Sequence, residues 1–148
     1  MKVMVIGTMS QASEGAMPSA EQFAAMDKFN EELINAGILL DGTGLTPTSR
    51  GARVRFSGSN RTVTKGPFAE TTEVIAGFSI WKVSSLQEAI DWVKKSPNCR
   101  SDDHDVEIRP LMEPEDFAGM VSPERIAEVK ELEAQAGDRD GYGLARFK

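Results

Sequence analysis

The sequence is poor in the residues that build disulfides and metal sites. Its 148 residues include one cysteine, Cys99, and one histidine, His104. A lone cysteine cannot form a disulfide within the chain, and one cysteine with one histidine supplies too few of the usual ligands for a zinc site. We therefore predict a protein of a reducing compartment, the cytoplasm, with no metal and no cofactor.

Long apolar runs and basic runs are also missing. No segment approaches the roughly 20 apolar residues that span a bilayer, and the opening MKVMVIGTMS is too short an apolar run for a signal peptide. The formal net charge is −6, and lysine and arginine form no basic stripe of the kind that binds nucleic acids. We therefore expect neither a membrane nor a nucleic-acid partner.

What the chain does contain is an alternation of apolar strands with amphipathic helices. Charged residues make up 27% and apolar residues 40% of a chain long enough to bury one core. Helical spacing predicts helices over 20–36, from Ser85 to Ser96 and from Ser122 to Gly137, and the first two begin with capping boxes. Strand patterns cover 3–6, 38–40, 74–83 and 105–110, and a β-hairpin covers 52–64 with its turn at 58–60.

The order of these elements predicts an α+β fold. Two helices in a β-α-β-β-α-β arrangement pack on one face of an antiparallel sheet, which is the ferredoxin-like plait. The hairpin is an insertion in that scheme, and the last helix forms a C-terminal arm. We therefore expect a domain over 1–113 and a helical extension and tail over 114–148.

The central strands are apolar on both faces. In the segment 74–83, strict alternation gives one face Val74, Phe78 and Ile80 and the other face Ile75, Trp81 and Val83. Two helices cover only one face, and each apolar side chain left in water would forgo about 1.5–3 kcal/mol of burial. Either the C-terminal arm or a second copy of the chain covers the other face. We favour the second copy and predict a homodimer.

Four separate blocks of the sequence then resemble one known family. LINAGILLDGTGLTPTS, VTKGPFAETTEVIAGFSIWKV, EAIDWVKKSPN and VEIRPL are together similar to the DGPF, or YCII-related, family over residues 1–113. The resemblance implies a dimeric α+β barrel, in which two plaits face each other across their sheets. The wider superfamily includes small enzymes that act on aromatic or lactone-like compounds, but no particular reaction follows for this branch.

The chain departs from the family inside its signature. Where the family has aspartate before Gly-Pro-Phe, this chain has Lys65, which reverses the local charge. YCII-like relatives have been suggested to use a His–Asp pair, but His104 lies in the hydrophilic run RSDDHD and matches no such position. We interpret His104 as a loop residue. The Gly-Pro-Phe turn is first of all a bend, with Phe68 buried beneath it, and Lys65 can pair there with Glu70 or Glu73.

Five residues are candidates for ligand contacts. They are Glu107, Arg109, Asp41, Lys65 and Phe68. Because the apolar Val106 and Ile108 are expected to face the helices, Glu107 and Arg109 should point to the opposite face of the sheet. There they form either a structural ion pair or an anion site. Asp41 follows the second strand in a glycine-rich turn, where it is either an Asx-type turn residue or a site residue.

Two classes of function fit these features. The first is a small cytoplasmic homodimer with a pocket between its sheets for a small polar or anionic metabolite, with or without catalysis. The second is a non-enzymatic binding or regulatory module whose acidic arm at 123–148 contacts a protein partner. A ligand pocket requires converging ionisable groups, whereas a docking module requires an exposed apolar groove.

Overall fold

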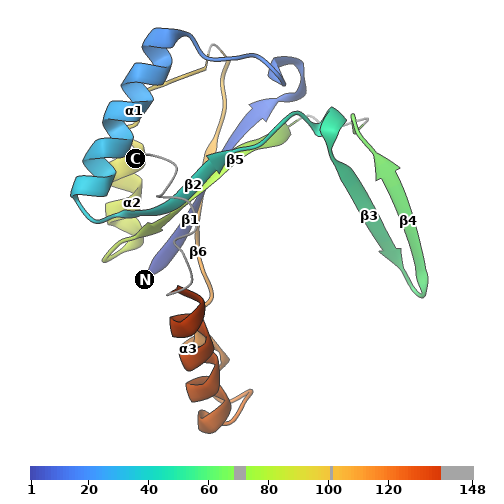
Figure 1. Cartoon of the computed structure of the whole chain (residues 1–148), viewed down its shortest axis with the longest axis vertical. Helices are drawn as coiled ribbons and strands as arrows, with labels where there is room; N and C mark the ends of the chain where they lie inside the picture. Colours follow the sequence, from blue (N-terminus) through green and yellow to red (C-terminus); the bar gives the residue numbers. More distant parts are fainter. Residues whose placement is uncertain (69–72, 101, 138–148) are drawn as a thin grey trace.

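The computed structural model describes residues 1–68, 73–100 and 102–137 (Figure 1). Its helices and strands, in chain order, are β1 (Lys2–Ser10), α1 (Ala20–Asn35), β2 (Leu39–Gly44), β3 (Ala52–Ser57), β4 (Asn60–Lys65), β5 (Glu73–Lys82), α2 (Leu86–Val93), β6 (Val106–Pro110) and α3 (Pro123–Gly137). Three short 3-10 turns are η1 (Gln11–Ser13), η2 (Thr48–Arg50) and η3 (Pro114–Phe117). In the described part of the chain, no helix is both long enough and apolar enough to cross a membrane.

Four strands form one antiparallel sheet in the order β2-β5-β1-β6, and α1 and α2 lie together on one face of it (Figure 1). This is the strand order of a ferredoxin-like plait, so the predicted α+β fold is confirmed. Strands β3 and β4 form a separate two-stranded sheet, which is the predicted inserted hairpin. Its two-residue loop contains Gly58 at φ 56°, a left-handed conformation that glycine adopts without strain.

Both helices begin at the predicted serine caps, but only α1 has the complete capping box. Ser19 and Gln22 form the complete capping box, with Ser19 Oγ accepting from the Gln22 amide at 3.2 Å and Gln22 Oε1 accepting from the Ser19 amide at 2.8 Å. Ser85 caps α2, but Glu88 turns instead to Ser84, whose amide and hydroxyl donate to its carboxylate at 2.7 and 2.6 Å. The second capping box is therefore incomplete, because Ser84 offers Glu88 two donors.

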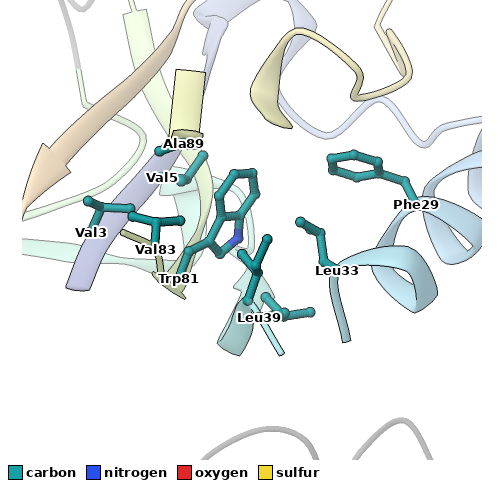
Figure 2. Packing of buried hydrophobic residues seen from close by; sticks show 9 residues of the cluster. Val3, Val5, Phe29, Leu33, Leu39, Trp81, Val83 and Ala89 are labelled. Atoms are coloured by element: carbon teal, nitrogen blue, oxygen red, sulfur yellow. The ribbon is translucent and has the colours of Figure 1, made fainter. Parts of the chain in front are cut away.

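The core fills the space between the helices and the sheet. It joins Val3, Val5, Phe29, Leu33, Ile38, Leu39, Trp81, Val83 and Ala89, and all of these except Ile38 are labelled in Figure 2. Phe29 of α1 lies between two indoles, with ring centroids 6.5 Å from Trp81 and 6.3 Å from Trp92. Val106 and Ile108 of β6 pack against the same cluster, so the helix-covered face of the last strand is the predicted one.

A bulge in β5 changes which of its side chains share a face. Gly7 pairs with Gly77 but Thr8 pairs with Ile75, so Ala76 is an extra residue and the alternation of β5 reverses there. Ile75 therefore shares a face with Phe78 and is 55% exposed, whereas Val74 is buried. The prediction that Val74 lies with Phe78 and Ile80 is wrong, because it assumed an unbroken strand.

The hairpin and the C-terminal arm both leave the body of the domain, at different ends of the sheet (Figure 1). The hairpin follows β2, whose last residue Gly44 is in register with Gly77 and, beyond it, with Gly7 of β1. The arm follows β6, whose last residue Pro110 pairs with Val3 at the other end of β1. The arm, which we define as residues 113–137, contains η3 and the predicted last helix, α3.

Candidate functional site

The face of the sheet away from α1 and α2 carries three of the five predicted site residues. We call it the open face and define it by Met4, Ile6, Asp41, Thr43, Phe78, Ile80, Glu107 and Arg109. These side chains alternate with the helix-facing Val3, Val5, Trp81 and Ile108 along their strands. Glu107 and Arg109 therefore point to the predicted face.

Asp41 lies within β2, so the prediction that it follows the second strand in a turn is wrong. It reaches the open face through a second bulge. Leu39 pairs with Trp81 and Asp41 with Ile80, so one residue of β2 is extra and the alternation shifts by one position. In a regular strand Asp41 would face the helices together with Leu39. Asp41 Oδ1 also accepts a hydrogen bond from the Gly42 amide at 2.7 Å, so it makes a local Asx-type contact while lying on the open face.

The strand register arranges the open face in two cross-strand rows. One row runs Asp41, Ile80, Met4, Arg109, and the next runs Thr43, Phe78, Ile6, Glu107. Each row therefore has polar groups on the two edge strands and apolar side chains on the two central strands. Met4, Ile6, Phe78 and Ile80 are partly buried in the single chain and belong to no part of the helix-side core.

Glu107 and Arg109 form a loose ion pair along the edge strand β6. Arg109 Nε lies 3.6 Å from Glu107 Oε1, and the two side chains are 71% and 55% exposed. Exposed pairs of this kind contribute about 0–1 kcal/mol to folding. The pair therefore does little for the stability of the single chain, and most of the Arg109 side chain is exposed to solvent.

Two further cations lie at the same end of the open face. Lys2 and Lys82 are cross-strand partners one row beyond Met4 and Ile80, and both side chains are exposed. Like charges directly opposite one another on a sheet repel and destabilise it slightly. The nearby Glu113 accepts from the Lys2 amide at 3.3 Å, and in the described part of the chain no carboxylate lies within ion-pair distance of either ammonium group.

The structure does not bring Lys65 and Phe68 to the open face. Lys65 ends β4 and pairs with Ala52 in the hairpin, which stands apart from the main sheet (Figure 1). Phe68 is 9% exposed, with the Arg53 guanidinium 4.0 Å above its ring, so its predicted burial is confirmed. The predicted partner Glu70 lies outside the described residues. The other, Glu73, accepts instead from the Thr8 hydroxyl at 2.5 Å.

The Gly-Pro-Phe turn is held by backbone packing. The Gly66–Pro67 bond is cis, and the Gly66 amide donates to the Gly51 carbonyl at 2.9 Å. A Cβ at Gly66 would lie 1.7 Å from the Thr48 carbonyl oxygen, so only glycine fits. Glu14 fixes that segment, because its carboxylate accepts from the Thr48 amide at 2.6 Å and from the Thr48 hydroxyl at 2.8 Å. These contacts hold the predicted bend in place.

The structure also shows an acidic cavity that no sequence pattern predicted. It has a volume of about 420 Å³ and is lined by Glu73, Asn98, Asp102, Asp103, His104 and Asp105. The hydroxyls of Ser13 and Ser10 donate to Asp102 at 2.7 and 2.9 Å and lower the pKa of its carboxyl to about 2. In the sequence, the run RSDDHD is the one feature that indicates this cavity. The same charged run is equally typical of a solvated loop, so it does not predict a cavity by itself.

The described residues support neither a cysteine nucleophile nor a metal site. Burial raises the pKa of the Cys99 thiol, which the charge of Arg100 only partly offsets, and the thiol lies 3.4 Å from the Gln22 carbonyl oxygen. That is the opposite of an activated nucleophile. Over the same described ranges, no group of three histidine, cysteine or carboxylate side chains is arranged to hold a metal ion.

The fold and the open face define an α+β protein of the ferredoxin-like class with a solvent-facing sheet. A comparison with known protein families identifies the family within this class of fold. Residues 1–113 match the YCII-related domain, and the chain belongs to that family. It is also 37% identical over 78 residues to an uncharacterised protein of Rhizobium meliloti (strain 1021). That match covers 53% of this chain and 63% of the relative.

Proposed function

We propose that this YCII-related protein is a cytoplasmic homodimer whose two open faces enclose a site for a small polar or anionic metabolite. The observation that carries the proposal is the pattern of the open face. Its apolar centre is flanked by ionisable groups on both edges, which is how small-molecule sites are composed. In a single chain this surface is a shallow sheet face, so the site is complete only when a second copy covers it.

The charges of the open face favour an anion at one end. Arg109 presents a planar set of N–H donors suited to a carboxylate or phosphate. Lys2 and Lys82 lie at the same end and repel each other, and a bound anion would relieve that repulsion. The carboxylates of Glu107 and Asp41 would accept from hydroxyl or amine groups of the same ligand. The proposal is therefore for binding, and it includes no reaction step.

Thermal shift against a panel of small carboxylates and phosphates tests this site. A ligand at 100 times its Kd stabilises a protein by about 2.7 kcal/mol, which for a chain of this size is roughly 5–10 °C in Tm. We expect at least one anion to raise the Tm of the wild type. The double variant Glu107→Gln, Arg109→Gln should fold normally but lose most of that increase.

A matched control changes an exposed charge pair on the helix layer. Asp27→Asn with Lys28→Gln removes one acid and one base from α1, where both residues are exposed. This variant should keep the full response to the anion. If no anion stabilises the wild type and the open-face double variant melts far lower than the control, the pair is structural and the site assignment is wrong.

A further inference from the structure

The hairpin carries exposed basic and apolar side chains and has no hydrophobic core of its own. Every residue of β3 and β4 is exposed, and the face that carries Val54, Phe56 and Val63 leaves these side chains 51%, 71% and 61% exposed. A two-stranded hairpin with neither face covered is marginally stable. This projecting element therefore requires a surface to pack against.

The charge of the hairpin is of one sign. The segment 45–65 contains five cations and no carboxylate; the cations are Arg50, Arg53, Arg55, Arg61 and Lys65. Arg61 and Lys65 lie on the same face as Val54 and Phe56, with the Arg61 guanidinium 4.1 Å above the Phe56 ring. In the described part of the chain, none of these cations lies in an ion pair.

The arm has the opposite charge and its own apolar groove. The segment 113–132 holds six carboxylates against two cations, Arg125 and Lys130. Both cations are already paired within the arm, Arg125 with Glu128 at 2.9 Å and Lys130 with Glu115. Glu124 and Glu131 make no ion pair within the described residues. The arm therefore presents a surplus of negative charge.

The groove of the arm lies between η3 and α3. It has a volume of about 220 Å³ and is lined by Pro114, Phe117, Val121, Arg125, Ile126 and Val129. Small-molecule sites measure about 300–1,000 Å³, so this groove is better suited to a protruding side chain. Leu132, which is 57% exposed, extends the apolar surface along α3. Phe56, at the exposed end of the hairpin, is an apolar side chain of suitable shape.

The structure points to a second copy of the chain as the partner that joins these two elements. The hairpin and the arm leave opposite ends of the sheet and lie apart in one chain (Figure 1). We propose that the basic hairpin of one copy docks against the acidic arm of another, with Phe56 at the apolar groove. Opposite charges on the two surfaces attract, and both apolar faces are then covered. This contact does not depend on the open-face dimer.

A charge-swap experiment tests the contact with full-length chains. One variant carries Arg61→Glu and Lys65→Glu on the hairpin, and the other carries Glu124→Lys and Glu131→Lys on the arm. These arm positions leave both internal ion pairs of the arm intact. Sedimentation equilibrium should show that each variant alone associates at least about tenfold more weakly than the wild type. An equimolar mixture of the two variants should recover most of the wild-type affinity, because the exchanged hairpin positions of one variant then meet the exchanged arm positions of the other with opposite charges.

A control matched to the hairpin variant makes the same charge change elsewhere. Lys28→Glu with Lys94→Glu reverses two exposed cations of the helix layer and should leave association unchanged. Two results would overturn the proposal. Either both swapped variants associate like the control, or affinity returns only when all four changes are placed in one chain, which indicates a contact within a single copy. Because none of these residues lies on the open face, failure here leaves the proposed ligand site untouched.

Discussion

Ile80 offers a direct test of dimerisation through the open face. It lies on the central strand β5, between Asp41 and Met4 in one cross-strand row, and is partly exposed in the single chain. Full burial of such a side chain contributes about 1.5–3 kcal/mol, and at most about a third of that remains to be gained by covering it. A two-fold interface contains Ile80 twice, so Ile80→Glu forfeits about 1 kcal/mol in total.

The introduced charge adds a larger cost. Each glutamate must be enclosed between the sheets or reach the rim, and enclosing a charge without a partner costs several kcal/mol. If the glutamate side chain reaches the solvent-exposed rim of the interface, its cost falls to about 1 kcal/mol per copy. Together with the lost apolar burial, the dimer is then destabilised by about 3 kcal/mol, which raises its Kd at least a hundredfold. The secondary structure of the single chain should survive, because Ile80 is outside the helix-side core.

Sedimentation equilibrium with circular dichroism as the check on folding measures this effect. The control is Ile34→Glu, the same substitution at an exposed position of α1 on the helix layer. Both substitutions are made in a chain that also carries Arg61→Glu and Lys65→Glu, so that the hairpin–arm contact does not mask the result. In that background we expect Ile34→Glu to keep the open-face dimer and Ile80→Glu to sediment as a folded monomer. A wild type that is a stable folded monomer at micromolar concentration would refute the reasoning, as would an Ile80→Glu variant with unchanged Kd.

Two further predictions concern stability. Gly66→Ala would place a Cβ 1.7 Å from the Thr48 carbonyl oxygen, so urea unfolding should show a loss of about 2–3 kcal/mol; a loss below 0.5 kcal/mol would mean that the turn adjusts freely. The second is Asp102→Asn, which removes a carboxyl whose folded pKa is lowered to about 2. A lowered pKa stabilises the fold above the unfolded value, near 3.8, and that stability is lost as the pH falls through the folded pKa. The Tm difference between wild type and Asp102→Asn should therefore shrink between pH 5 and pH 2, and a difference independent of pH would contradict the assignment.

Local sequence patterns determined most of the secondary structure and the class of fold. Apolar periodicity and capping residues such as Ser19 placed α1, and clean alternation at 105–110 placed Glu107 and Arg109 opposite the helices. The burial of Phe68 also followed from its place after a glycine-proline turn. These features depend on residues close together in the chain, and local sterics and hydrogen bonding govern them.

Tertiary structure alone decided which residues share the open face. A bulge in β2 puts Asp41 on the same face of the sheet as Arg109, and a bulge in β5 separates Val74 from Phe78. A bulge shifts alternation by one residue, so its presence depends on how neighbouring strands pair and cannot be read from one strand. The distance of Lys65 from the open face, and the separation of the hairpin from the arm, were likewise set by strand pairing. The detailed pairing of strands far apart in the sequence sets these distances, and no pattern within a single strand records that pairing.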